Sequence, residues 1–308
     1  MALPDEVKEL AAKVRNWGRW GADDQIGTLN LVTDDVVRSA AACVQQGRRF
    51  ALGIPLDHNG PQTGLIPGRT NPLRTMLMIN TALTGDPSDF CTSDDTVTMG
   101  LQAGTHWDGL GHVSYEGVLY NGVPASVINE FGAMRLGIHN VTSLVSRGVL
   151  LDVARAKGVE RLEGGYAISG DDLDAAADLG DVDVRPGDVI LLRTGQIQLF
   201  LAGDKEAYGA PAPGPSLQSV QWFRDHDVAA VATDNITFEV YPCEREDALL
   251  PVHLLHLVDM GMTQGQNWNF ETLAADCAAD GRYTCFLDAS PLPFTNAVGA
   301  PVQPVAVK

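Results

Sequence analysis

Residues 101–112 read LQAGTHWDGLGH and place two histidines on either side of an aspartate in a glycine-rich frame. If this stretch is extended, its side chains alternate between two faces. One face then carries Gln102, Gly104, His106 and Asp108. Imidazole and carboxylate groups are ordinary ligands of zinc or manganese, and the Gln102 amide oxygen is a weaker one. Gly104 leaves room on that face for an ion or a substrate, so the stretch predicts a metal site.

His112 follows this segment after Gly109 and Gly111, which let the chain turn sharply. Such a turn would bring His112 back over the face that carries His106 and Asp108. A histidine that lies near a metal-bound water, without being a ligand itself, is suited to act as a general base. We therefore predict that His112 is catalytic.

Working outward, apolar periodicity predicts strands that alternate with helices in the second half of the chain, as is typical of a mixed α/β domain. The predicted strands cover residues 75–80, 96–106, 149–153, 189–193 and 228–233. The predicted helices cover residues 5–15, 34–46, 171–179, 217–225, 252–260 and 271–278. Residues 51–75 are rich in glycine and proline and predict a long loop. No repeat or linker divides the chain, so we expect one domain over residues 1–308, with an N-terminal helical arm over about residues 1–33.

The 308 residues include 39 acidic and 21 basic ones, which gives a formal net charge of −18. This balance argues against a nucleic-acid partner, which requires a basic face. No run approaches the roughly 20 apolar residues of a membrane helix, and the N-terminus lacks the apolar segment of a signal peptide. The five cysteines are scattered and form no C-x-x-C pair. We expect a cytoplasmic protein with a small-molecule substrate and neither nucleic acid nor membrane as partner.

The 101–112 stretch resembles the signature His-x-Gly-Thr-His-x-Asp-x-x-x-His of the cyclase-like metal-dependent hydrolases. That family includes bacterial kynurenine formamidases, isatin hydrolases and proteins described as polyketide cyclases. Similar segments extend over most of the chain: RWGADD at 19–24, GTLN at 27–30, GVLLD at 148–152, PGD at 186–188, RTG at 193–195, TD at 233–234, PVH at 251–253, GM at 261–262 and GQ at 265–266. The resemblance implies a single mixed α/β domain of the cyclase and kynurenine formamidase type, with a swivelling β/α/β-like core and surrounding helices. It also implies a homodimer or homotetramer, in which N-terminal segments can help to close a neighbouring subunit's site.

Carried over residue by residue, the resemblance implies that His106 and Asp108 are metal ligands and that His112 is the catalytic histidine. His253 matches a downstream histidine that binds a second metal in the dinuclear members. His256, one helical turn later, is a competing candidate for that position.

Two positions depart from the family pattern. Gln102 stands where the signature usually has histidine, and Gln266 stands where dinuclear members have glutamate. A neutral amide at each position removes one strong nitrogen donor and one negative charge, so a second cation would be poorly compensated. We therefore predict one zinc or manganese ion at most, loosely held by His106, Asp108 and Gln102 with help from His253. A site without metal is the alternative.

Four further residues are predicted to contact a ring-bearing substrate, namely Trp20, Trp107, Tyr120 and Asn121. Trp107 points away from the ligand face if its strand is regular, which favours core packing or an interface as the alternative for this residue.

The predicted function is hydrolysis of an amide, lactam or N-formyl bond in a small substrate by a metal-activated water, with His112 as the general base. One alternative is a polyketide-type cyclase or dehydratase that uses the same site without an attacking water. The other is a binding protein that keeps the fold and has lost catalysis.

Overall fold

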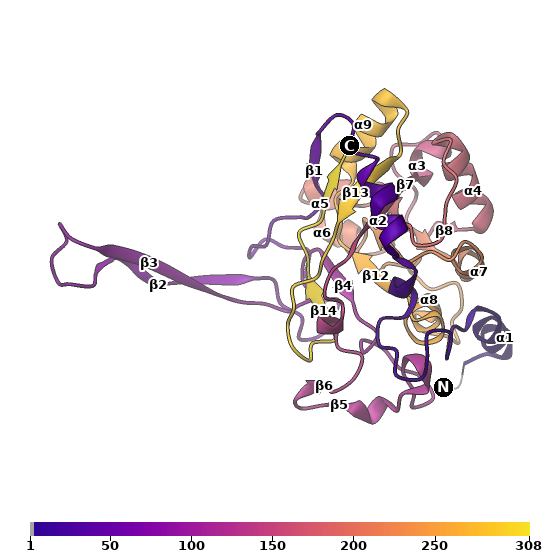
Figure 1. Cartoon of the computed structure of the whole chain (residues 1–308), viewed down its shortest axis with the longest axis horizontal. Helices are drawn as coiled ribbons and strands as arrows, with labels where there is room; N and C mark the ends of the chain where they lie inside the picture. Colours follow the sequence, from indigo (N-terminus) through magenta and orange to yellow (C-terminus); the bar gives the residue numbers. More distant parts are fainter. Residues whose placement is uncertain (1–2) are drawn as a thin grey trace.

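Three runs of apolar residues form the centre of the sheet in the computed structural model, which describes residues 3–308 (Figure 1). Strands β7 (Val145–Asp152), β9 (Val189–Arg193) and β11 (Ala230–Thr233) lie side by side and parallel. Their residues are almost all buried, because helices and loops cover both faces of a parallel sheet. The prediction for residues 189–193 matches β9, and the predictions for 149–153 and 228–233 overlap β7 and β11.

The complete sheet has nine strands in the order β1-β15-β13-β7-β9-β11-β12-β4-β14. Strand β12 (Thr263–Gln266) pairs parallel with β11, whereas the pairs on either side of this parallel block are antiparallel. The remaining members are β1 (Arg49–Ala51), β4 (His106–Asp108), β13 (Thr284–Asp288), β14 (Gly299–Pro301) and β15 (Val305–Val307). Two small additional sheets pair β5 (Ile128–Asn129) with β6 (Gly132–Ala133) and β8 (Ala167–Ile168) with β10 (Gly214–Pro215). The fold is the single mixed α/β domain expected from the sequence.

Two hydrophobic clusters cover the two faces of the sheet, and successive residues of the central strands contribute to opposite clusters. Val149 and Leu151 belong to the cluster that includes α1, α4 and α7, whereas Leu150 belongs to the one that includes α9 and Trp268. The α-helices are α1 (Asp5–Val14), α2 (Asp34–Ala41), α3 (Val153–Ala156), α4 (Gly170–Leu179), α5 (Ile197–Leu201), α6 (Lys205–Gly209), α7 (Leu217–Asp225), α8 (Pro251–Leu254) and α9 (Glu271–Asp280). Helix α8 continues as the π-helix η5 (Leu255–Met260), and 3-10 turns lie at η1 (Gly27–Leu31), η2 (Tyr120–Gly122), η3 (Ala125–Val127) and η4 (Ile138–Asn140). None of the helices within residues 3–308 is both long and apolar enough to cross a membrane.

Two predicted elements are shorter in the structure. The helix predicted over 34–46 ends at Ala41, because the chain then turns so that Gln46 and Arg48 can both donate backbone hydrogen bonds to the Lys308 carbonyl. The strand predicted over 96–106 was wrong in its second half. Strand β3 (Cys91–Thr98) ends before Gly100, a turn closes between Gly100 and Ala103, and β4 begins only at His106.

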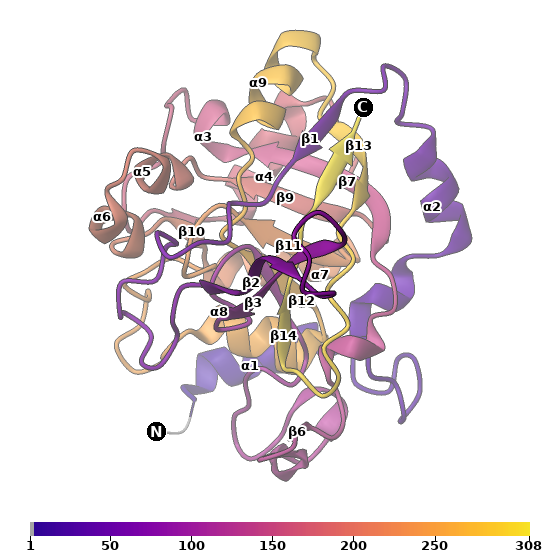
Figure 2. The same ribbon diagram turned by 90° about the vertical axis from the view of Figure 1, so that its left-hand side faces the viewer.

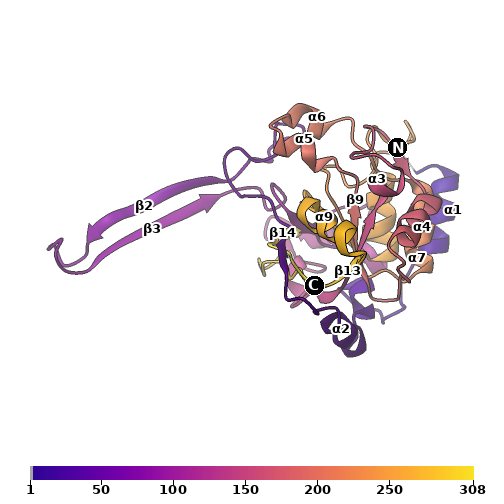
Figure 3. The ribbon, with the colours of Figure 1, turned by 90° about the horizontal axis from the view of Figure 1, so that it is seen from above.

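A long β-hairpin projects from the body of the molecule (Figures 1 and 3). Strands β2 (Leu73–Ala82) and β3 pair antiparallel with each other and form a separate two-stranded sheet. Figure 2 shows the hairpin end-on in front of the main sheet. It carries a row of large apolar side chains that are mostly exposed, namely Leu73, Met76, Leu77, Ile79, Leu83, Phe90 and Val97. In this region the sequence predicted a strand over 75–80, within β2, and the start of the one over 96–106, which overlaps the end of β3.

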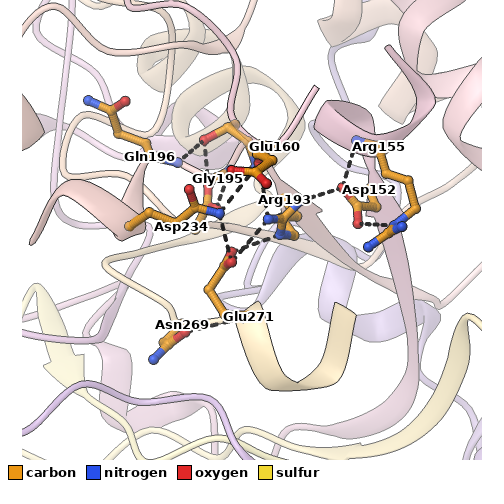
Figure 4. Close-up of polar contacts among 11 residues, drawn as sticks. Asp152, Arg155, Glu160, Arg193, Gly195, Gln196, Asp234, Asn269 and Glu271 are labelled. Carbon is orange, nitrogen blue, oxygen red and sulfur yellow. Dashed lines mark hydrogen bonds and ion pairs between the residues drawn. The ribbon is translucent and has the colours of Figure 1, made fainter. Parts of the chain in front are cut away.

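A buried ion-pair network joins the ends of β7 and β9 to α9 (Figure 4). The Arg193 guanidinium donates to Asp152 Oδ1 at 2.8 Å and to both Glu271 carboxylate oxygens at 2.8 and 3.0 Å. The side chains of Arg193 and Asp152 are 7% and 0% exposed. Two buried charges of this kind remain stable only while both are paired and hydrogen-bonded.

We predict that Arg193→Met lowers the free energy of unfolding by on the order of 3 kcal/mol, because it leaves the buried Asp152 without its closest cation. The control is Arg185→Met, which removes an exposed ion pair with Asp183 and should cost about 0–1 kcal/mol. Urea unfolding measures both values. Equal stabilities for the two variants would show that the buried network contributes nothing beyond an exposed pair.

Candidate active site

Strand β4 lies inside the sheet, between β12 and β14, and supplies the central residues of the site. His106 faces Gln266 of β12 and Pro301 of β14, and Asp108 faces Gln264 and Gly299. Because side chains alternate along a strand, His106 and Asp108 share a face as predicted and Trp107 points to the opposite one.

The polar ends of the His106 and Asp108 side chains approach each other. His106 Nδ1 lies 2.8 Å from the Gly104 carbonyl, so this nitrogen carries the proton and Nε2 carries the lone pair. Nε2 lies 3.4 Å from Asp108 Oδ1. Both atoms are fully buried and neither has a hydrogen-bond partner among residues 3–308. Two buried acceptors that face each other without a proton between them leave a place suited to a cation.

His112 lies above this pair, with its Nε2 3.6 Å from Asp108 Oδ1. A backbone hydrogen bond from His112 to Gly109 closes the turn that the two glycines predicted. Burial lowers the pKa of His112 and outweighs the opposing effect of Asp108, so its imidazole is neutral near pH 7. Burial alone would raise the pKa of Asp108, but the adjacent His112 and His106 outweigh it and the pKa falls, so the carboxyl is ionised.

The second half of the site comes from α8 and β12. His253 Nδ1 donates to Glu239 Oε1 at 2.7 Å, and Glu239 also accepts the backbone N–H groups of Val252 and His253. This contact leaves the lone pair of His253 on Nε2. The Gln266 side-chain nitrogen donates to Asp108 Oδ2 at 2.7 Å and lies 3.3 Å from His253 Nε2. One amide group thus contacts an acceptor atom of each of these two residues.

The two competing histidines occupy different environments. His253 lines a cavity beside Gln266, whereas His256 is fully buried within η5 and packs edge-on against Phe223 and Phe238. Burial lowers the pKa of His256 to about 3, so it stays neutral in the core. The structure therefore brings His253, and not His256, to the site.

The positions of Gln102 and Gly104 differ in detail from the extended arrangement that was predicted. Gln102 lies in the turn before β4, and its side-chain nitrogen reaches Gly299, the neighbour of Asp108 in β14. Gly104 does not leave room for an ion. A Cβ atom there would lie 2.4 Å from Leu56 Cδ2, so the glycine allows the loop after β1 to pack closely.

A cavity of about 380 Å³ opens over His112, His253 and Gln266. Its other walls are mainly aliphatic, and the complete lining consists of Leu65, Ile66, Arg69, His112, Val113, Ile236, Thr237, Tyr241, Leu249, Leu250, His253 and Gln266. Arg69 and the aliphatic residues were not identified from the sequence. Arg69 is a single residue in a loop rich in glycine and proline, where no periodicity marks its direction.

The four predicted substrate contacts lie outside this cavity. Trp107 is buried in the core, where its ring packs against Trp268 at 4.9 Å and its Nε1 donates to the Ala289 carbonyl. The other three belong to the docking of the N-terminal segment. The Tyr120 hydroxyl donates to Asp24, Asn121 bonds to the backbone of Gly18, Gly21 and Ala22, and the Trp20 ring lies under the Arg19 guanidinium.

Two unpartnered donor atoms converge in the site. Within residues 3–308, no group of three or more His, Cys, Asp or Glu side chains is arranged to hold a metal ion. The unpartnered His106 Nε2 and Asp108 Oδ1 nevertheless offer a nitrogen and a charged oxygen to the same point. Gln266 already occupies the other oxygen of Asp108, and this contact leaves no anionic ligand for a second ion.

Comparison with known proteins gives a family and several similar folds. Residues 50–240 match the family model described as "Putative cyclase". A crystal structure described as a novel cyclase is 41% identical over 96% of this chain and 99% of its own, with a TM-score of 0.87. An isatin hydrolase bound to the product analogue thioisatinate is 16% identical over 86% of this chain and 93% of its own, with a TM-score of 0.63. Isatin hydrolase A from Ralstonia solanacearum is 18% identical over 85% and 92%, with a TM-score of 0.61. No curated protein matches the chain.

We predict that Gln266→Glu increases the zinc bound per chain after dialysis by about one equivalent, because a second carboxylate beside Asp108 and the His253 lone pair requires a cation. The control is Gln266→Met, which has a similar length and no charge and should bind no additional zinc. Elemental analysis of the dialysed proteins gives the measurement. A folded Gln266→Glu protein with the zinc content of the wild type would contradict the assigned role of Gln266.

Proposed function

This chain belongs to the cyclase family, and from that premise we propose that it is a metal-dependent hydrolase of an amide, lactam or N-formyl bond in a small ring-bearing substrate. The observation that carries the proposal is the meeting of three groups under an apolar cavity. His106 and Asp108 present unpartnered acceptor atoms to one point, and the neutral His112 lies beside them.

The residues that would hold the metal are His106 through Nε2 and Asp108 through Oδ1, with Gln102 as a neutral neighbour. A bound zinc or manganese ion would supply the Lewis acidity that activates water and polarises a carbonyl group. The protein's own contribution is to fix the donors. The Gly104 carbonyl sets the tautomer of His106, and Gln266 sets the rotamer of Asp108.

His112 is the proposed general base. It lines the cavity, and because its pKa is lowered it can accept a proton at neutral pH. In the proposed reaction His112 takes a proton from the attacking water and returns it to the leaving nitrogen. The aliphatic walls bind the ring of the substrate and exclude competing water.

The second candidate function is cyclisation or dehydration of a carbonyl compound without an attacking water. The Gln266 amide favours this candidate, because it places a neutral donor where a bridging carboxylate would strengthen metal binding. In that reaction His112 would move a proton within the substrate. Reaction in ¹⁸O-labelled water separates the two candidates, since only hydrolysis incorporates the label into the product.

We also propose that the protein acts in the cytoplasm as a homodimer or homotetramer. The exposed apolar row on the β2–β3 hairpin supports an assembly, because an isolated two-stranded hairpin is marginally stable in water. Sedimentation equilibrium measures the oligomeric state, and a monomer at all concentrations would contradict the proposed homodimer or homotetramer.

We predict that His112→Ala lowers kcat for hydrolysis by roughly 10²- to 10⁴-fold, the usual contribution of a positioned general base. Its metal content should stay at the wild-type value. The matched control is His58→Ala in the exposed loop after β1, which should keep full activity. Steady-state assays on N-formyl arylamines and lactams give the rates. An unchanged kcat in His112→Ala would remove His112 from the mechanism.

We predict about one equivalent of zinc or manganese per chain in protein purified without chelator. The double variant His106→Ala, Asp108→Ala should lose this metal, because it lacks both the imidazole nitrogen and the carboxylate oxygen that would bind it. Elemental analysis measures the metal. Chelation should abolish hydrolysis, and added zinc or manganese should restore it. Protein that contains no metal, stays folded and gains no activity with divalent cations would reject the hydrolase proposal.

A further inference from the structure

Arg69 is the one arginine or lysine in the lining of the cavity over His112 and His253. It lies in the loop between β1 and β2 and shares the cavity wall with His112 and His253. The charge of Asp108 acts on Arg69, and the charge of Arg69 acts on His112, so the guanidinium lies close to the reacting groups. Burial lowers the pKa of Arg69 and outweighs the opposing effect of Asp108, so the partly buried guanidinium has no full counter-charge.

The Arg69 guanidinium has no hydrogen bond or ion pair with any side chain or carbonyl of residues 3–308. The other inward-facing arginines differ in this respect. Arg147 binds both oxygens of Asp188 at 2.8 and 2.6 Å, and Arg193 binds Asp152 and Glu271. A partly buried cation without a partner is stabilised by an anion that pairs with it.

The loop also holds Arg69 in place. A Cβ atom at Gly100 would lie 3.0 Å from Arg69 Cγ, so the arginine stem packs directly on the glycine backbone. The Arg69 backbone N–H donates to the Ile66 carbonyl within the loop, and the Gly100 N–H donates to the Thr70 carbonyl, which joins this loop to the segment after β3. The position of the guanidinium at the cavity wall is thus fixed by packing of its stem.

None of the twelve lining residues is Asp or Glu. Of the nearest acidic group, Asp108, one oxygen accepts from Gln266 and the other points to His106 and His112. The counter-charge for Arg69 must therefore come with the ligand. A planar guanidinium fits a carboxylate through two parallel hydrogen bonds.

We propose that Arg69 binds a carboxylate on the substrate, so that the substrate is an apolar, ring-bearing carbonyl compound that carries a carboxylate away from the reacting bond. This assignment rests on the proposed function for the reacting bond, but its binding part can be tested without turnover. Arg69 selects the substrate, and His112 with the metal ligands performs the reaction.

The binding test uses two probes that cannot be hydrolysed, 3-phenylpropanoate and the neutral 3-phenylpropan-1-ol. Calorimetric titration of the wild type should show tighter binding of the carboxylate by roughly 10- to 100-fold, the range of one charge-assisted hydrogen-bonded pair. Arg69→Gln should lose this preference while keeping its affinity for the alcohol. The matched control is Arg74→Gln on the exposed hairpin, which should keep the preference.

Retention of the carboxylate preference in Arg69→Gln would overturn the proposal, because the metal or a histidine would then hold the anion. Equal weakening of both probes would also overturn it, since Arg69 would then act only through packing. Gly100→Ala, which displaces the Arg69 stem, should weaken the carboxylate selectively.

A kinetic test separates this proposal from the proposed function. With a carboxylated N-formyl arylamine and its uncharged parent as substrates, Arg69→Gln should raise KM for the first by roughly 10-fold or more and leave kcat unchanged. Loss of kcat for both substrates would assign Arg69 to the reaction and overturn its role in selectivity. If the wild type hydrolyses neither compound, the proposed function fails, and the calorimetric preference still decides the role of Arg69.

Discussion

The register between β4 and β12 is the constraint on which the site depends. The antiparallel pairing of His106 with Gln266 places the side chain of Asp108 beside the Gln266 amide, which also lies 3.3 Å from His253 Nε2. A slip of one residue would turn His106 and Asp108 into the core and bring Trp107 into the cavity. The indole of Trp107, which packs against Trp268 and donates to the Ala289 carbonyl, opposes that slip, so the core side of β4 fixes the positions of His106 and Asp108.

The candidate site contains few charged groups. Asp108 is the only anion between His106 and His112, and the neutral Gln266 amide lies beside it. A site with one carboxylate would balance a divalent cation less completely than a site with two, and Arg69 adds a further positive charge at the cavity wall. An anionic ligand relieves this excess, which links the substitution at Gln266 to the chemistry of the substrate.

The sequence predicted those parts of the fold and site that depend on local pattern. The apolar run of β9 and helix α7 have the predicted bounds, and the alternation at His106 and Asp108 placed both on one face. The prediction from sequence failed where contacts between residues far apart in the chain determine the local structure. The strand predicted through 96–106 breaks where Gly100 donates to the Thr70 carbonyl and Ala103 turns back to Gly100, and the first of these contacts comes from a distant loop. The importance of Arg69 rests on the absence of a partner, which no sequence pattern records.

The length of the hairpin formed by β2 and β3 is independent of the main sheet that carries the candidate site. Its strands pair only with each other, so residues can be added to or removed from both without changing the register of the main sheet. The eight residues of β3 extend the arm by about 26 Å, at roughly 3.3 Å per residue. Each residue inserted in β2 together with one inserted opposite it in β3 would lengthen the arm by about 3.3 Å. The distance between the hairpin tip and the body of the molecule can therefore change in evolution while the main sheet and its candidate site stay the same.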